Sequence, residues 1–127
     1  MIRPALLDAS FLIALERETA KGDIGPARRF LPKLRGRRLA VSIVTVEEIL
    51  EGAADEAAAF ASLQRFAIQG LHLAQARRCA PLQRRAASRM GENDAWLVAT
   101  AESMPADIVG ADRQAFERLG TGYLRFR

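Results

Sequence analysis

Short apolar runs alternate with longer segments of helical spacing along this chain, and this alternation constrains the fold most strongly. A run at residues 5–7 ends at Asp8, and apolar residues then recur at helical spacing. A second run, residues 39–44, precedes a helix that we expect to begin at Thr45 and to end near Gly52. Alternating strands and helices predict an α/β domain with a mostly parallel central sheet of four to five strands and helices on both faces.

The remaining segments continue the same alternation. We expect further helices at residues 27–34, 53–66, 74–89, 94–103 and from Arg113, and short strands at 71–73, 107–109 and 122–126. Pro81 is expected to start a helix or to kink one. Because no repeat, linker or low-complexity segment interrupts the 127 residues, we expect a single domain over 1–127.

Arginine dominates the basic side chains of the chain. Seventeen of the 19 basic residues are arginine, the formal net charge is +4 and the sequence pI is near 10.2. The planar guanidinium suits bidentate contacts with phosphate, so a nucleic acid is a plausible partner, although a GC-rich genome also favours arginine codons. Eight arginines have two possible interpretations: they line an RNA path, or they form ordinary solvated helix surface. They are Arg28, Arg29, Arg35, Arg37, Arg38, Arg84, Arg85 and Arg89.

Single residues and missing segments exclude several classes of protein. Cys79 is the only cysteine, so no internal disulfide or cysteine-based zinc site is available, and a small apolar core residue is expected. His72 is the only histidine, and we expect it on the surface or in a strand. No apolar run is long enough to cross a membrane, and the first residues lack a signal peptide's apolar stretch, which predicts a cytoplasmic protein.

Four acidic residues follow the expected strands or begin the helices after them. They are Asp8, Glu48, Asp94 and Asp112. Because the carboxyl ends of parallel strands meet at one edge of a sheet, these carboxylates are expected to converge there. Converging carboxylates repel one another unless a cation neutralises them, and oxygen ligands favour Mg²⁺ or Mn²⁺. Such an ion can orient and deprotonate a water for attack on phosphorus.

Each acid also has a purely structural interpretation. Asp8, Asp94 and Asp112 stand where a helix is expected to begin, and aspartate is a favoured N-cap. Thr45 and Glu48 have the spacing of a capping box, in which Glu48 would reach back to the backbone. Independent capping would not select four acids at the same sheet edge, and their joint pattern therefore favours a metal site.

Four segments, in order along nearly the whole chain, resemble the motifs of the PIN-domain family: Leu6–Leu15, Ser42–Gly52, Gly91–Ala101 and Asp107–Phe116. In the first segment, Asp8 is followed two positions on by Ser10, a small hydroxyl residue as in the family. In the second, the family's acid lies four residues before a glycine, which selects Glu48 rather than Glu47.

The resemblance implies a PIN-like three-layer α/β/α sandwich and a metal-dependent endoribonuclease of the VapC toxin type. It assigns Asp8, Glu48, Asp94 and Asp112 to the acidic pocket, the first three as ligands of Mg²⁺ or Mn²⁺, with Ser10 supporting a ligand or water. It further implies a cognate antitoxin protein that blocks the pocket, an RNA substrate and a homodimer. The family's usual hydroxyl or basic residues before the fourth acid are Gly110 and Ala111 here, so Asp112 could position water or cap a helix instead.

Three other phosphate-handling interpretations do not fit the sequence, and one alternative is kept. A haloacid-dehalogenase-like phosphatase would require an aspartate at Ser10, a receiver domain would require a late lysine, and no glycine-rich nucleotide-binding motif occurs. The main alternative is a non-catalytic PIN-like module that binds RNA or a protein without cleaving it. Trp96 either stacks on a base or, as is more usual for an aromatic residue beside Leu97 and Val98, belongs to the core.

Overall fold

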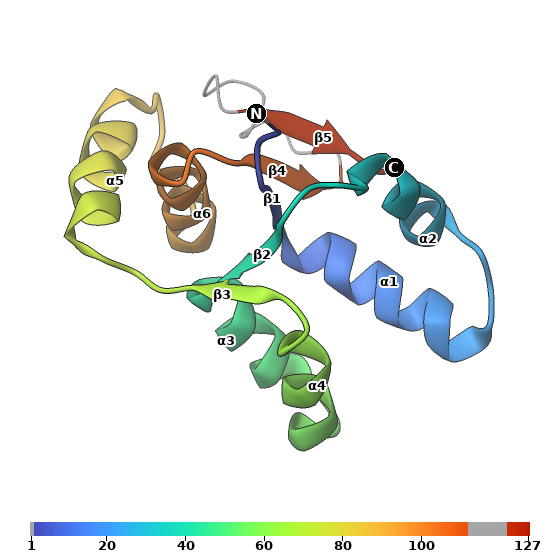
Figure 1. Ribbon diagram of the computed structural model, residues 1–127. Helices are drawn as coiled ribbons and strands as arrows, with labels where there is room; N and C mark the ends of the chain where they lie inside the picture. Colours follow the sequence, from blue (N-terminus) through green and yellow to red (C-terminus); the bar gives the residue numbers. More distant parts are fainter. Residues whose placement is uncertain (1, 112–121) are drawn as a thin grey trace.

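A five-stranded parallel sheet forms the centre of the computed structural model, which describes residues 2–111 and 122–127 (Figure 1). The strands are β1 (Ala5–Leu7), β2 (Leu39–Ser42), β3 (Ala67–Gln69), β4 (Asp107–Gly110) and β5 (Tyr123–Arg125). Their order across the sheet is β3-β2-β1-β4-β5, and every neighbouring pair is parallel. The expected α/β class and strand number are confirmed.

Helices connect the strands and cover both faces of the sheet (Figure 1). They are α1 (Ala9–Lys21), α2 (Pro26–Phe30), the 3-10 helix η1 (Leu31–Leu34), α3 (Ile43–Gly52), α4 (Glu56–Leu63), α5 (Leu73–Arg85) and α6 (Glu92–Ser103). Figure 1 shows α5 and α6 on one side of the sheet and α1 and α2 on the other. The three-layer sandwich is therefore confirmed.

Alternation along β1 divides the buried side chains between two hydrophobic clusters. Ala5 and Leu7 face the cluster formed with α1 to α4, whereas Leu6 faces the cluster formed with α5 and α6. Phe11 anchors the first cluster, with its ring 5.0 Å from that of Phe126 in an edge-on arrangement. Because β1 is central and buried on both faces, it is apolar without interruption until Asp8.

Two expectations about local structure are confirmed, for Cys79 and for Trp96. Cys79 is buried in the second cluster, and burial raises the pKa of its thiol, as expected of a core residue. Trp96 packs partly buried against the same cluster, in agreement with the core interpretation. Pro81 lies inside α5. Among the described residues, no helix is both long and apolar enough to span a membrane.

Several element boundaries differ from expectation, and two of the differences have a clear physical cause. Helix α3 begins at Ile43 rather than Thr45, because the buried Ser42 side chain caps the helix by accepting from the Val44 amide at 3.2 Å. The strand expected at residues 71–73 is wrong, since pairing with β2 occurs at Ala67–Gln69 and His72 is the N-cap of α5. The helix expected from Arg113 lies outside the described residues.

The sheet order creates a switch point between β1 and β4. From β1 the chain moves outward to β2 and β3, and it then returns to the other side of β1 to form β4 and β5. Across the sheet, β2 and β3 lie on one side of β1 and β4 and β5 on the other, an order that opens a crevice at the carboxyl edge of α/β sheets. Asp8 lies at this switch point, where its amide donates to the Val109 carbonyl at 3.0 Å.

Candidate active site

Asp8 is a buried carboxylate at the exit of the central strand. Its side chain caps α1, because Oδ1 accepts from the Phe11 amide at 3.0 Å, and the residue is 3% exposed. The Ser10 hydroxyl donates to the same oxygen at 2.6 Å. The capping interpretation of Asp8 is therefore correct, and both of these hydrogen bonds are made to Oδ1.

Ser10 also joins the exits of β1 and β4. Its Oγ accepts from the Ala111 amide at 3.1 Å while its hydroxyl donates to Asp8. A single hydroxyl thus ties the carboxylate after the first strand to the backbone after the fourth. This contact fixes the orientation of Asp8 relative to the loop that leads to Asp112, which itself lies outside the described residues.

Gly110 provides the space in which the Asp8 carboxylate lies. A Cβ built on Gly110 would overlap the carboxylate, with its Cγ only 2.7 Å away. Gly110 stands where the family pattern usually has a hydroxyl or basic residue. Its lack of a side chain is therefore a packing requirement in this protein. Sequence reasoning missed this role, because only the pairing of β4 with β1 brings Gly110 beside Asp8.

Glu48 lies within α3 rather than at its start, and the expected capping box with Thr45 is wrong. Ser42 is the cap, and Thr45 is 2% exposed inside the helix. Glu48 is half-buried, whereas Glu47 is exposed. The pKa of Glu47 is raised mainly by the charge of Glu51, together with burial and the charge of Glu48. The α3 surface beside the site is thus strongly negative.

Asp94 lies in the first turn of α6 and is half-buried. The helix begins after Gly91, which has no side chain with which to cap it, so the interpretation of Asp94 as the N-cap is wrong. An acidic side chain one turn into a helix is still favoured by the positive end of the helix dipole. Capping therefore does not explain the position of Asp94.

Contacts between helices link the elements that carry the three described acids. Helix α3, which carries Glu48, contacts both α1, which begins after Asp8, and α6, which begins before Asp94. Within residues 2–111 and 122–127, however, no three acidic, histidine or cysteine side chains form a group that could hold a metal ion. The three described acids offer only oxygen ligands, which suit a hard divalent ion.

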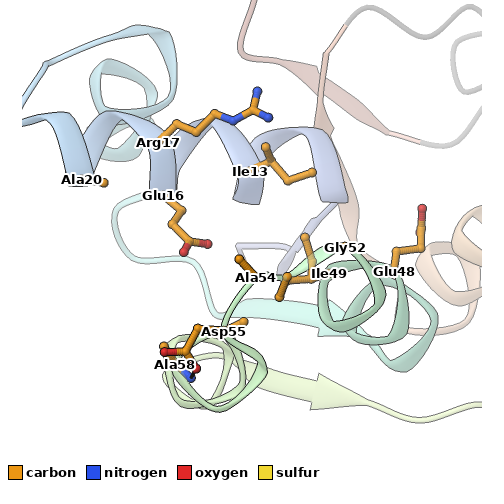
Figure 2. A pocket seen from close by; sticks show the side chains of 12 residues that line it. Ile13, Glu16, Arg17, Ala20, Glu48, Ile49, Gly52, Ala54, Asp55 and Ala58 are labelled. Atoms are coloured by element: carbon orange, nitrogen blue, oxygen red, sulfur yellow. Dashed lines mark hydrogen bonds between the residues drawn. The ribbon is translucent and has the colours of Figure 1, made fainter.

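A cleft of about 460 Å³ runs from this acidic region between α1, α3 and α4 (Figure 2). Apolar residues including Ile13, Ile49 and Ala54 form much of its lining. Figure 2 shows Glu48 at one end of the cleft, apart from Glu16 and Asp55. An elongated, largely apolar ligand with a basic end would match this lining.

Several arginines of the expected RNA path also have contacts within the chain. Arg37 pairs with Asp107 at 2.8 Å, and Arg89 pairs with Glu92. Arg28 and Arg29 donate to the backbone carbonyls of Asp23 and Ile24. Arg37 and Asp107 lie at the amino edge of the sheet, where Arg3 also binds Asp107 at 2.9 Å. These arginines therefore do not surround the acids.

A family model described as the PIN domain matches residues 5–121. A search of curated protein sequences gave no match.

Solved structures with the same fold come from several bacteria. A toxin–antitoxin complex from Klebsiella pneumoniae is 22% identical, covers 97% of this chain and 98% of that chain, and has a TM-score of 0.78. VapBC-1 from nontypeable Haemophilus influenzae is 19% identical over 96% of this chain and 97% of that chain, with a TM-score of 0.73. VapBC-5 from Mycobacterium tuberculosis, a member of the VapBC family of toxin-antitoxin systems, is 24% identical over 98% and 99%, with a TM-score of 0.66.

Proposed function

Because this chain belongs to the PIN domain family, we propose that it is a metal-dependent endoribonuclease that hydrolyses phosphodiester bonds of RNA. The observation that carries the proposal is the position of Asp8, a buried carboxylate at the switch point of the sheet, oriented by Ser10 and accommodated by Gly110. Burying a carboxylate is costly, and a site of this kind at the carboxyl edge of an α/β sheet is typical of catalysis.

Asp8, Glu48 and Asp94 would hold the ion, Mg²⁺ or Mn²⁺, and Asp112 would complete the acidic pocket. When bound, the ion supplies charge that activates a water and shields the phosphate oxygens during attack. Ser10 holds Asp8 in one orientation, with its second oxygen beside Gly110. The half-buried Glu48 and Asp94 come from helices that contact each other, which supports a shared ion.

Cleavage of total RNA with Mg²⁺ or Mn²⁺ tests this proposal. We expect cleavage by the wild type, loss of at least about 100-fold in Asp8→Asn and Asp94→Asn, and loss on adding a chelator. Asp23→Asn, which changes an exposed acid of a distant loop by the same one charge, is the matched control and should cleave normally. Equal products from all four proteins, or activity that survives the chelator, would contradict the proposal. RNA binding without cleavage would favour the non-catalytic alternative.

We further propose that the chain is the toxin of a toxin–antitoxin pair and that the antitoxin occupies the cleft between α1, α3 and α4. The apolar lining suits the apolar side of a partner segment, and a basic side chain from it would pair with Glu48 and its acidic neighbours. The similar structures from Klebsiella and Haemophilus are described as toxin–antitoxin or VapBC structures. Expression from the native operon should yield a complex, and expression alone should arrest growth. Recovery of the chain alone without growth arrest would oppose this role.

A homodimer is proposed on the basis of an exposed apolar patch beside the edge strand β3. Ile68, Leu71 and Leu73 are 41%, 39% and 75% exposed, and Ile68 lies on β3 itself. Large exposed apolar side chains that lie near one another mark interaction surfaces more often than isolated ones do. None of the three residues lines the cleft between α1, α3 and α4.

A further inference from the structure

A second charged region lies on the segment that contains α2, η1 and the start of β2. Between residues 24 and 46 the chain has no aspartate or glutamate. The same segment carries six basic residues, namely Arg28, Arg29, Lys33, Arg35, Arg37 and Arg38. A second acid-free stretch, residues 57–91, also carries six arginines but over 35 residues, so the uncompensated positive charge is denser between residues 24 and 46.

Three of these cations border a shallow groove of about 520 Å³, here called the basic groove. Its apolar lining comes from Leu31, Pro32, Leu34 and Leu39, and its basic lining from Arg28, Arg35 and Arg37. Gly36 forms the turn at the groove with φ of 83°, a backbone conformation that favours glycine. The turn thereby brings Arg35 and Arg37 to the same groove.

The positive charge of the groove is mostly not neutralised in the described part of the chain. Arg37 is held by Asp107, and that carboxylate is already shared with Arg3. The ion pairs found between described residues include none with Arg28, Arg29, Lys33, Arg35 or Arg38. Arg35 and Arg38 are exposed, so their guanidinium groups are accessible to a ligand.

The basic groove and the acids lie at opposite edges of the sheet. The Arg38 carbonyl accepts a hydrogen bond from the amide of Ala5, the first residue of β1. Asp8, in contrast, directly follows the last residue of β1. Strands rise about 3.3 Å per residue, so the two edges are separated by about 10 Å of β1 alone. A ligand that reaches both regions must therefore be long, and a small phosphate compound cannot do so.

We propose that the basic groove binds the phosphodiester backbone of single-stranded RNA at a distance from the acidic site. Arg28 and Arg35 contact phosphates, and the apolar lining contacts riboses or bases, which is the arrangement of grooves that bind single strands without strong sequence preference. The inference rests on the proposed ribonuclease function. It adds that substrate affinity depends on a surface that takes no part in cleavage.

The concave shape and the chemistry of the groove favour RNA over other acidic partners. A membrane surface is flat and would contact the rims without the apolar lining, and an acidic protein would need to insert a narrow carboxylate-bearing segment. A nucleic-acid strand offers regularly spaced phosphates together with flat, partly apolar bases. The arginine content of the rim suits phosphate in particular, because guanidinium groups bind it in a bidentate manner.

Fluorescence anisotropy with a labelled single-stranded RNA of mixed sequence, about 20 nucleotides long, tests the inference. A chelator in the buffer prevents metal-dependent cleavage, so binding is measured independently of catalysis. We expect the full-length Arg28→Gln/Arg35→Gln variant to bind about tenfold more weakly at low salt. The slope of log affinity against log salt should fall by about 1.4, because two phosphate contacts are lost.

Arg77→Gln/Arg78→Gln is the matched control. It removes the same charge from exposed positions on α5, on the far side of the sheet from α2 (Figure 1), and should leave the salt slope unchanged. If the first variant is unfolded, Arg35→Gln alone, at an exposed position, should reduce the slope by about 0.7. Thermal unfolding of every variant checks that the fold is retained.

Each outcome distinguishes this inference from the proposed function. Equal weakening in both double variants, or none in either, would overturn the inference, and so would binding to phosphatidylserine vesicles or a polyglutamate peptide in preference to RNA. Selective weakening in the groove variant would support it. If RNA binding weakens only in the groove variant but RNA cleavage persists in the presence of a chelator, the proposed metal-dependent function is contradicted and the groove assignment stands.

Discussion

Asp8 has two tasks that can be separated by substitution. Its carboxylate caps α1 through the Phe11 amide, and the same group is the proposed ligand at the centre of the acidic pocket. Asparagine caps helices as well as aspartate does but lacks the negative charge, whereas alanine does neither. The chain therefore provides a direct way to distinguish structural from metal-binding contributions at one residue.

We predict that Asp8→Asn keeps nearly the stability of the wild type without metal, while Asp8→Ala loses about 1 kcal/mol more through the missing cap. Millimolar Mn²⁺ should raise the melting temperature of the wild type and of neither variant. Thermal and urea unfolding with and without Mn²⁺ measure both effects. An equal Mn²⁺ response in the wild type and Asp8→Asn would contradict a role for Asp8 as a ligand.

Gly110 is required by the close approach of the Asp8 carboxylate. We predict that Gly110→Ala lowers the free energy of unfolding by about 1–3 kcal/mol, because the added methyl group overlaps that carboxylate. RNA cleavage should fall as well, because Asp8 must move. Gly52→Ala is the control, since a Cβ there meets no atom within 4 Å. Urea unfolding of both variants gives the comparison, and an unchanged Gly110→Ala protein would refute the packing argument.

At the scale of elements, Glu18 attaches α2 to α1. Its carboxylate accepts from the backbone amides of Gly25 and Arg28, both at 2.9 Å, and of Ala27 at 3.0 Å. Burial raises the pKa of Glu18, but these hydrogen bonds outweigh burial and hold the pKa below its ordinary value of 4.5. One side chain thus satisfies amides at the start of α2 that no residue of that helix can satisfy.

The lowered pKa of Glu18 predicts a pH-dependent contribution to stability. A carboxyl group whose pKa is lower in the folded state stabilises the protein above its unfolded pKa and ceases to do so as pH falls through the folded value. Glu18→Gln should therefore unfold at lower urea concentration than the wild type at pH 7, and the difference should shrink below about pH 4.5. Glu16→Gln, an exposed acid of the same helix, is the control. A difference that is independent of pH would contradict this assignment.

At the scale of the whole molecule, the apolar patch at Ile68, Leu71 and Leu73 predicts self-association. We expect the wild type to have twice the chain mass of 13.9 kDa in solution. Leu73→Glu should produce a monomer without unfolding, because an acid at the first position of α5 is favoured by the helix dipole. Ile24→Glu, at a residue 64% exposed in the loop before α2, is the matched control. Light scattering after size-exclusion chromatography measures the molar mass of each protein, and a monomeric wild type would disprove the dimer.

Much of this architecture could be predicted from local patterns. Apolar runs near residues 5–7 and 39–42 form strands because uninterrupted apolar side chains can be buried on both faces of a parallel sheet. The helical spacing after Asp8 buries Phe11, Leu12 and Leu15 on one face of α1. Three-layer packing then follows, because each helix must cover its apolar side. The helix boundaries were less predictable, since Ser42 and Thr45 are both competent caps and only the end of pairing in β2 decides between them.

The sequence by itself determined the alternation of strands and helices and the identity of the acids that follow them, because hydrophobic periodicity and residue chemistry are local properties. Only the tertiary structure decided that Gly110 lies against Asp8, that Ser10 joins two strand exits, and that Arg37 lies at the opposite sheet edge from the acids. These neighbours are distant along the chain. Their contact depends on the order in which parallel strands pair, and that order results from packing of the whole molecule rather than from any one segment.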